Sequence, residues 1–403
     1  MRNSIQGPGP SCRASNPATE KNAKSNPLAT FEHFQVCIEV NTDTPRVFIA
    51  ATRQNDGKTT ASLGLIAALQ QHFPRVGYIK PVGQRFVEIE EQKIDEDTVL
   101  MNSVYRLNCP LVDMSPIAVE PDFTRKYLQQ SNRDALVKKI QKAFDRVAWE
   151  KDFVLCEGSG HAGVGSVFDL SNAQVAKTLG AKVIIITRGG IGKPIDEVCL
   201  NQALFEKEGV EIIGVILNKV LGDKMDSITD FARRGLKRKG LELLGVIPHQ
   251  SLLSSPTVEL VREELNAEVL NANGDRRALI ASVIVGAMGA QNATSYFRRG
   301  ALLITPGDRE DIVLAACTSL DAHPDDRIAG LVLTGNLRPS SVLMKIIQAM
   351  PIPVLLAAQD SYEAAAIVHD STVKTRPSDA EKISLIRDLI AKNVNLPKIL
   401  ESL

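Results

Sequence analysis

A buried strand, a short polar loop and a helix follow one another at residues 47–66, and this run constrains the fold more than any other part of the chain. The loop ends in Gly57-Lys58-Thr59-Thr60, where the helix is expected to start. Unpaired N–H groups and the helix dipole make such a helix start a binding site for phosphate. We expect Lys58 to reach the outer phosphates there and the hydroxyl of Thr59 to ligate Mg²⁺. The alternative is an ordinary helix start, because Thr52 stands where the strict pattern has glycine.

Apolar runs alternate with helical stretches from Arg46 to about residue 250. The expected strands are residues 47–50, 76–79, 153–156, 183–187, 212–217 and 244–247. Between them lie the amphipathic segments 61–71, 134–149, 172–179 and 195–208. Strands that are apolar throughout and separated by helices are typical of a parallel sheet covered on both faces. We therefore expect a doubly wound, parallel-sheet α/β P-loop NTPase domain over residues 45–250.

A second, smaller α/β domain is expected over residues 276–403, after a linker at residues 251–275. Its expected strands are residues 279–285, 301–304, 330–333 and 354–356, and its expected helices are residues 311–319, 341–350, 361–369 and 378–391. One further helix, at residues 258–265, falls within the linker. The alternation of short apolar runs with helical periods again indicates a parallel sheet.

Residues 1–44 differ from the rest of the chain, because they are rich in Asn, Ser, Pro and Ala and lack a steady hydrophobic period. This composition predicts a disordered leader. A misassigned start codon and an organellar transit peptide are the alternatives that the sequence leaves open.

Charge and cysteine content exclude some classes of protein. The chain has 47 basic and 47 acidic residues, so nothing in its net charge attracts nucleic acid or an anionic membrane. No apolar run reaches the roughly 18 residues of a membrane-spanning helix. The six cysteines form no CxxC pair, which argues against a zinc ribbon or a disulfide framework and favours a reducing compartment. We expect a cytoplasmic protein with no nucleic-acid or membrane partner.

Five motifs, in order and spacing, resemble dethiobiotin synthetase and the related cobyrinic acid amidases over roughly residues 46–250. They are the phosphate loop, residues 78–83 (YIKPVG), 153–160 (FVLCEGSG), 183–187 with 189–192 (VIIIT and GGIG), and 214–218 (GVILN). The phosphate loop of that family is one residue longer than usual, and Ala51 stands at its first glycine. Residues 245–248 (GVIP) are similar to the segment that closes the family's nucleotide pocket.

The resemblance implies ATP and Mg²⁺ as cofactors, with Lys58 and Lys80 as the catalytic residues. It implies that Thr59, Asp97 and Glu157 surround the metal and that Asn218 lies by the nucleotide base. The residues expected to bind nucleotide are Thr52, Arg53, Asn55, Asp56, Gly57, Lys58, Thr59, Thr60 and Asn218. Taken alone, residues 95–97 also read as a solvated acidic helix start, Lys80 as a surface lysine and Asn218 as the cap of a turn.

Two further residues have open alternatives. His161 stands where the family has a small residue, which argues against dethiobiotin synthesis itself. It is either an acid, base or phospho-acceptor, or a solvent-facing residue of a turn. Arg53 precedes Lys58 by five residues. It either reaches a partner's nucleotide across a dimer, as a lysine does in the related partition-type ATPases, or it points to water or to its own phosphates.

The second half resembles the DRTGG domain at residues 285–288 (VGAM), 302–311 (LLITPGDRED) and 333–339 (LTGNLRP). Together, the two domains resemble the N-terminal, regulatory half of long bacterial phosphotransacetylases. The acetyltransferase half of those proteins would follow residue 403, so no acetyltransferase activity is expected. Asp308 and Arg309 either line an effector pocket or subunit contact, or form a turn before an acid-started helix.

Two functions follow from these resemblances. One is an ATP-binding regulatory or nucleotide-sensing protein, expected to form a homo-oligomer and to have a phosphotransacetylase-type enzyme as a partner. The other is an ATP- and Mg-dependent ligase or amidase, related to dethiobiotin synthetase and cobyrinic acid diamide synthase, that activates a small-molecule acid as a mixed phosphoric anhydride. The DRTGG-like domain and the altered loop at His161 favour the first.

Overall fold

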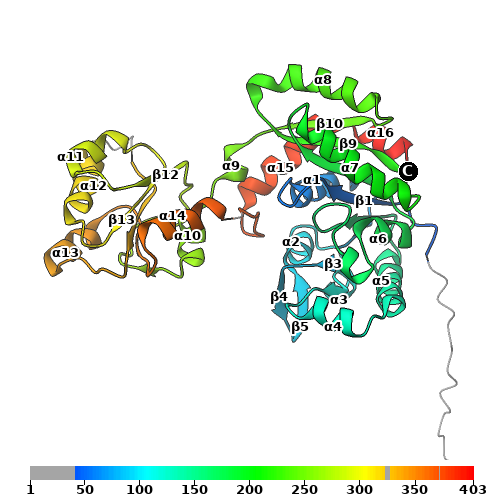
Figure 1. Cartoon of the computed structure of the whole chain (residues 1–403), viewed down its shortest axis with the longest axis horizontal. Helices are drawn as coiled ribbons and strands as arrows, with labels where there is room; N and C mark the ends of the chain where they lie inside the picture. The colour runs from blue at the N-terminus through cyan, green and yellow to red at the C-terminus, as the bar shows by residue number, and fades with distance from the viewer. Residues whose placement is uncertain (1–40, 323–326, 372) are drawn as a thin grey trace, which may run out of the picture. The chain divides into compact units, whose positions relative to one another are not determined.

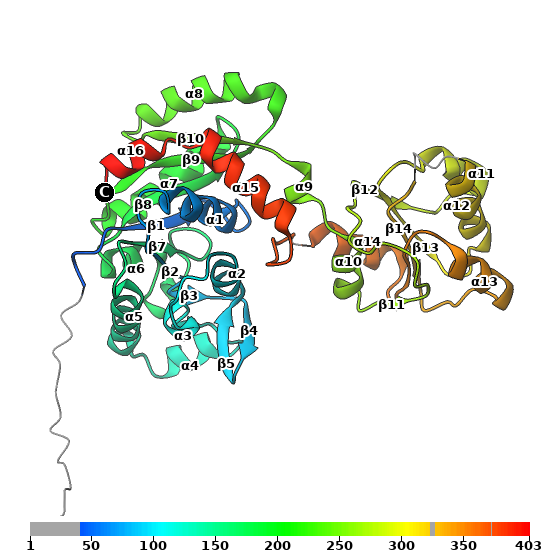
Figure 2. The same cartoon turned by 180° about the vertical axis from the view of Figure 1, so that it is seen from behind.

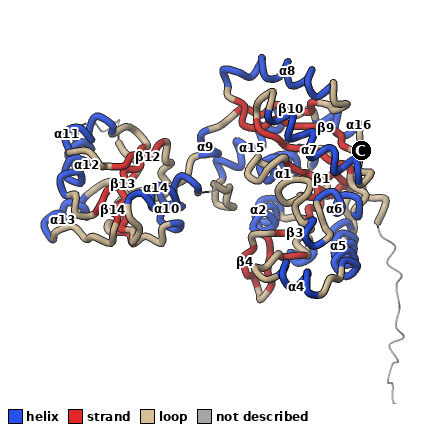
Figure 3. The backbone as a smooth tube through the Cα atoms, viewed as in Figure 1, coloured by secondary structure: helices blue, strands red, loops and turns tan. Residues whose placement is uncertain are grey.

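The structure is a computed structural model that describes residues 41–322, 327–371 and 373–403 (Figure 1). Residues 1–40 of the expected leader, with Cys12 and Cys37, lie outside the described residues. The described chain contains one sheet of six strands and one of five, and in Figure 3 each has strands at its centre and helices outside. The expected α/β class, with two sheets of unequal size, is confirmed.

The larger sheet is parallel throughout, with strand order β10-β9-β8-β1-β7-β2. Its strands are β1 (Arg46–Ala51), β2 (Val76–Ile79), β7 (Phe153–Glu157), β8 (Lys182–Arg188), β9 (Ile212–Val220) and β10 (Leu243–Pro248). All six were expected, because an interior strand between two helix layers is apolar on both faces. The strand order reverses beside β1, so the carboxyl ends of β1 and β7 border the crevice where open α/β sheets bind ligands.

Helices cover both faces of this sheet (Figures 1 and 2). They include α1 (Lys58–Leu69), α5 (Arg133–Ala148), α6 (Asn172–Thr178), α7 (Lys193–Lys207) and α8 (Met225–Lys237). The sequence predicted the first four of these helices and missed α8. Their apolar faces and the strands form one continuous core, in which Phe48, Tyr78, Phe144 and Phe153 are fully buried.

Several short elements lie between β2 and α5, and the sequence predicted only the start of one of them, the helix that begins at the acidic residues 95–97. They are β3 (Val82–Gly83), β4 (Phe86–Ile89), β5 (Gln92–Asp95), α2 (Glu96–Tyr105), α3 (Leu111–Met114), β6 (Ile117–Ala118) and α4 (Phe123–Gln129). The β4–β5 hairpin is largely exposed and too short to show a hydrophobic period. It leads into α2, where the side chain of Asp95 caps the helix by accepting from Asp97 N at 3.0 Å.

The smaller sheet has the order β11-β15-β14-β13-β12, with β11 antiparallel at one edge. Its strands are β11 (Glu268–Val269), β12 (Ser282–Val285), β13 (Ala301–Pro306), β14 (Gly330–Thr334) and β15 (Val354–Leu356). On one face lie α10 (Val258–Glu264) and α14 (Ser361–Asp370), and on the other α11 (Ala290–Ala293), α12 (Glu310–Ala322) and α13 (Ser341–Ala349). The strand β12 begins later than expected, because the N–H groups of Ile280 and Ala281 bond to Pro256 and Gly300.

The last two helices, α15 (Ala380–Asn393) and α16 (Leu396–Glu401), share the core of the larger sheet. In Figures 1 and 2, α15 lies beside α1. Gly64 of α1 allows this approach, because a Cβ there would fall 2.1 Å from Cγ1 of Ile390. From the sequence these residues were expected to belong to a domain at 276–403, whereas in the structure their apolar side chains pack in the first core. A helical period shows that a helix forms but not which sheet it covers.

These contacts define two modules. The first module comprises residues 41–257 and 373–403, and the second module comprises residues 258–371. In sequence, the second module is therefore inserted between β10 and α15. Over the described ranges, no helix combines the length and apolar character that crossing a membrane requires.

Candidate functional site

The loop between β1 and α1 is shaped by Asp56 and Gly57. Gly57 has a φ of 102°, in the left-handed region that glycine adopts readily, and it directly precedes α1. The fully buried Asp56 carboxylate accepts hydrogen bonds from Thr52 Oγ1 at 2.7 Å and from Arg188 Nε at 3.1 Å. Thr52 Oγ1 also lies 2.9 Å from Thr187 Oγ1 of β8. Thr52 and Asp56, which were expected to contact nucleotide, thus brace the loop from inside.

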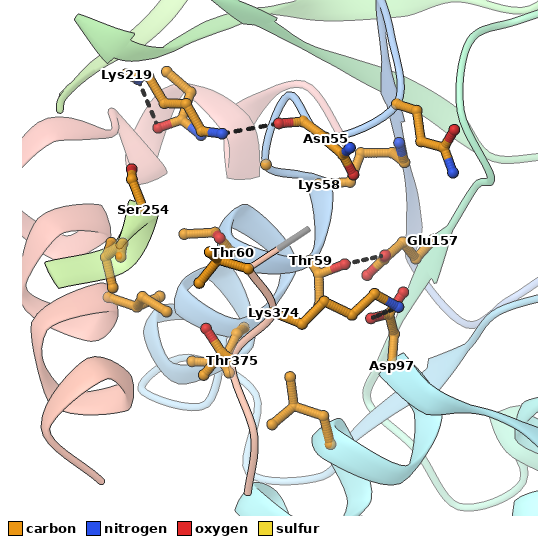
Figure 4. Close-up of a pocket in the computed structure, with 18 of the residues that line it drawn as sticks. Asn55, Lys58, Thr59, Thr60, Asp97, Glu157, Lys219, Ser254, Lys374 and Thr375 are labelled. Atoms are coloured by element: carbon orange, nitrogen blue, oxygen red, sulfur yellow. Dashed lines mark hydrogen bonds and ion pairs between the residues drawn. The ribbon is translucent and has the colours of Figure 1, made fainter. Parts of the chain in front are cut away.

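Asn218, near the end of β9, contacts the same loop from two strands away, because β8 lies between β1 and β9. Its Nδ2 donates to the main-chain oxygen of Asp56 at 2.9 Å. The next residue, Lys219, donates from Nζ to the main-chain oxygen of Asn55, also at 2.9 Å (Figure 4). Asn218 was expected by the nucleotide base. In the structure, its amide nitrogen is bonded to the loop backbone.

Lys58 and Thr59 lie close to Glu157, at the end of β7. Burial lowers the pKa of Lys58, and the nearby Glu157 carboxylate opposes this shift. Thr59 Oγ1 donates to Glu157 Oε1 at 3.0 Å (Figure 4), and the Tyr78 hydroxyl donates to Oε2 at 3.2 Å. Glu157 is completely buried, and this burial raises its pKa.

Three carboxylates surround Lys80, just after β2. Its Nζ forms an ion pair with Asp97 and lies 3.0 Å from Asp95 Oδ1 and 3.8 Å from Glu157 Oε1. Burial alone would lower the pKa of Lys80, but the carboxylates outweigh it and raise that pKa. Burial also opposes ionisation of Asp97, yet Lys80 lowers the pKa of that carboxyl overall. Lys80 is therefore a buried, charged residue at the ligand edge of the sheet and not a surface lysine.

The oxygen atoms near Thr59 fit a magnesium ion that also takes ligands from phosphate. Thr59 bonds to Glu157, and it helps to lower the pKa of Asp97, so both carboxylates lie near its hydroxyl. Magnesium in nucleotide sites takes one or two carboxylates and completes its octahedron with phosphate oxygens and water. Among the residues with assigned positions, no group of three or more His, Cys, Asp or Glu side chains forms a full metal cage.

These residues line a cavity of about 340 Å³ in which polar and charged side chains predominate. Those labelled in Figure 4 come from the phosphate loop and the start of α1, from α2, β7 and β9, and from segments near β10 and α15. Within the described chain, the basic residues that line the cavity are Lys58, Lys80, Arg85, Arg188, Lys219 and Lys374, and the acidic ones are Asp95, Asp97, Glu157 and Asp370. Basic side chains outnumber acidic ones, so the cavity suits an anion.

The other sequence candidates lie elsewhere or have structural partners. Arg53 pairs with Glu197 of α7 and is about half exposed, and it does not line the cavity. His161 is exposed, and its Nδ1 accepts from Gly163 N at 3.2 Å, as in the solvent-facing alternative. Arg309 pairs with Asp311 and donates to the main-chain oxygen of Met288 at 2.7 Å, as expected for a turn before an acid-started helix.

Six of the charged residues that line the cavity in the described chain were not predicted as site residues from the sequence: Arg85, Asp95, Arg188, Lys219, Asp370 and Lys374. Asp95 belongs to an acidic run that was interpreted as a helix start. Its position two residues before Asp97 was the signal that could have indicated a place in the site. Lys374 lies between α14 and α15, with Nζ 2.7 Å from Glu96 Oε2 and 3.9 Å from Asp97 Oδ1. No motif surrounds Lys374 in the sequence, and only the fold brings it to the cavity.

Comparisons with protein families agree with this division of the chain. The model of the family described as AAA domain matches residues 45–257, and that of the DRTGG domain matches residues 260–371. The chain thus combines a P-loop NTPase-like domain with a DRTGG domain. The DRTGG match ends just before the segment that leads to α15.

Among curated proteins, the chain is similar to bacterial phosphate acetyltransferases. It is 27% identical over 368 residues to that of Nitratidesulfovibrio vulgaris, which covers 87% of this chain and 50% of the relative. It is 28% identical over 365 residues to that of Pseudomonas aeruginosa, which covers 86% of this chain and 50% of the relative. The chain therefore spans about half the length of these relatives.

Among solved structures, the chain is similar to the septum site-determining protein MinD complexed with Mg-ADP from Pyrococcus horikoshii OT3. The match has a TM-score of 0.32 and 16% identity, and it covers 55% of this chain and 84% of that one.

Proposed function

Because the chain belongs to the AAA domain family through residues 45–257, we propose that its first module binds a nucleoside triphosphate with Mg²⁺ and that this binding has a regulatory, nucleotide-sensing role. The observation that carries the proposal is the set of contacts beside the phosphate loop, where Lys58, Thr59 and Glu157 meet in one cavity. ATP is the nucleotide that the resemblance to dethiobiotin synthetase suggests.

The surroundings of each residue support a role in binding the phosphates or the metal. The N–H groups at the start of α1 and the Lys58 ammonium bind the phosphates, since both present positive charge at one helix end. Thr59, Glu157 and Asp97 would hold the metal. When bound, Mg²⁺ neutralises phosphate charge and fixes the orientation of the phosphates. Lys80, which the neighbouring carboxylates keep charged, would contact the outer phosphate.

The regulatory part of the proposal is supported by the second module and by the relatives. A DRTGG domain is inserted into the chain of the nucleotide module, and the relatives that match 86–87% of this chain are phosphate acetyltransferases of about twice its length. We propose that nucleotide binding sets the state of the second module, and that a phosphotransacetylase-type enzyme and further copies of the chain are its partners.

Calorimetric titration of the purified protein with MgATP and other nucleoside triphosphates tests the core of the proposal. Wild type should bind, and Lys58→Ala should lose binding because the phosphate charge then has no nearby ammonium. Lys177→Ala, which removes a surface ion pair with Glu208, is the control that should bind like wild type. Equal binding by wild type and Lys58→Ala would contradict a site at the phosphate loop.

A second function, an ATP-dependent ligase, is favoured by one observation, the buried charged Lys80 beside Glu157. In a ligase, this ammonium would stabilise the charge that develops on the transferred phosphoryl group and on an acid substrate. ATP turnover measured with and without a library of small carboxylic acids separates the two functions. ATP turnover that requires an acid and is lost in Lys80→Ala would support the ligase. ATP turnover that is the same with and without acids would support sensing.

A further inference from the structure

Lys374 belongs to the segment that returns from the second module to α15, yet it lies at the phosphate cavity of the first. Its Nζ is 2.7 Å from Glu96 Oε2. It also lies 3.9 Å from Asp97 Oδ1 (Figure 4). The side chain of Lys374 is 33% exposed, so it is neither fully solvated nor enclosed by protein. It therefore borders the space that a ligand would fill.

The segment that leads from β10 into the second module borders the same cavity. Ser254 of α9 (Ser251–Ser254) lines it after β10, and Lys374 and Thr375 line it before α15. Both ends of the inserted DRTGG module thus pass the place where the nucleotide is proposed to bind. A ligand in this cavity would contact the connections directly.

Asp97 lies between two lysines, Lys80 on one oxygen and Lys374 on the other. In the proposed function, Asp97 serves the metal, so the metal and Lys374 compete for the same carboxylate. The metal arrives with phosphate oxygens, which are acceptors for an ammonium on a flexible stem. The exchange would leave Lys374 paired with the nucleotide, where before it was paired with α2.

We infer that Lys374 is a nucleotide-binding residue that contacts the outermost phosphate of a nucleoside triphosphate, so that the connection to the second module distinguishes triphosphate from diphosphate. The inference rests on the proposed function and names the residue through which nucleotide binding would affect the second module. A diphosphate lacks the outer group, so Lys374 would stay with Glu96 and Asp97.

Calorimetric titration of the full chain with MgATP and with MgADP tests this inference. Lys374→Ala and Lys374→Gln should each weaken MgATP binding roughly tenfold, as expected for one charge-assisted hydrogen bond, and leave MgADP binding within about twofold. The matched control is Lys93→Ala, because Lys93 and Glu120 form an ion pair of similar length and exposure, 2.6 Å and 39%/45%, and Lys93 does not line the cavity.

Hydrogen exchange gives a readout at the segment itself. MgATP should slow exchange at residues 373–379 in wild type more than MgADP does, and this difference should vanish in Lys374→Gln. Equal weakening of both nucleotides, or no change in either, would overturn the inference. If Lys58→Ala loses binding while both Lys374 variants bind like wild type, only this inference fails, whereas no binding by wild type would overturn the proposed function with it.

Discussion

Nδ2 of Asn218 lies 2.9 Å from the main-chain oxygen of Asp56, and this bond ties the end of β9 to the phosphate loop. It also fixes the identity of the neighbouring residue. A Cβ on Gly57 would fall 2.0 Å from the same nitrogen, and the φ of 102° disfavours any L side chain. The phosphate loop is thus fixed by side chains from β8 and β9, Thr187 and Asn218, and by the backbone of Gly57.

Gly57→Ala should abolish nucleotide binding, because it strains the loop and displaces Asn218. Asn218→Ala should weaken binding by about tenfold, since the loop loses a buried hydrogen bond. The double variant should remain as defective as Gly57→Ala, because removing the amide leaves the backbone strain. Nucleotide titration is the measurement. Gly180→Ala, which has a φ of 58° and open space around it, is the control and should bind normally.

Glu157→Gln should remove most of the Mg²⁺ dependence of nucleotide binding. In wild type, this dependence should fade on acidification at a pH above the ordinary glutamate range, because burial raises the pKa of Glu157. Mg²⁺ is bound by the ionised carboxylate, which forms only as the pH rises through the raised pKa. The Mg²⁺ dependence should therefore increase with pH. Titrations at fixed nucleotide and varied Mg²⁺ over acidic pH measure it. A metal dependence that persists unchanged in the variant would exclude Glu157 as a ligand.

Nucleotide affinity should fall with rising pH before the ordinary lysine range near 10.5 is reached, because burial lowers the pKa of Lys58. Binding requires the ammonium, so affinity is lost as the pH rises through the lowered pKa. Lys58→Arg should bind more weakly but with a flatter pH profile, because a guanidinium stays charged. Calorimetry from neutral to alkaline pH distinguishes these cases, and parallel profiles would argue against the role of Lys58.

Ile390→Ala should destabilise the first module by about 2–5 kcal/mol, because it empties the contact between α15 and α1. Urea denaturation followed by circular dichroism and by nucleotide binding measures the loss. Val342→Ala on α13 is the control, because this valine is 71% exposed and its truncation should change stability by no more than about 0.5 kcal/mol. Unaltered stability in Ile390→Ala would show that α15 is not part of the first core.

The sequence predicts the sheets well, because a strand buried on both faces has to be apolar at every position. Residues 76–79 and 354–356 coincide with β2 and β15 at both ends. Short exposed elements such as the β4–β5 hairpin leave no such pattern. The position of α15 also has no local signal, because a helical hydrophobic period does not specify which sheet the helix covers.

The candidate site shows the same limit. Lys58 and Thr59 open the helix after β1, and Glu157 ends β7. Because β1 and β7 are paired, these residues meet at the carboxyl edge of the sheet. Asn218 was expected near the base, but a side-chain amide can equally bond to a backbone, and only the structure shows which partner it has. Lys374 reaches the cavity through contacts between residues far apart in sequence, which no motif encodes.

The insertion of the second module before α15 has a consequence for how the protein is made. A ribosome completes residues 258–371 before it releases α15 and α16, so the nucleotide module still lacks these two helices when the DRTGG module is whole. The DRTGG module can therefore fold first, in reverse of the usual N-terminal-first order of synthesis. Until α15 arrives, the apolar surface of α1 around Gly64 stays uncovered, and the nascent chain is then most open to chaperones and to aggregation.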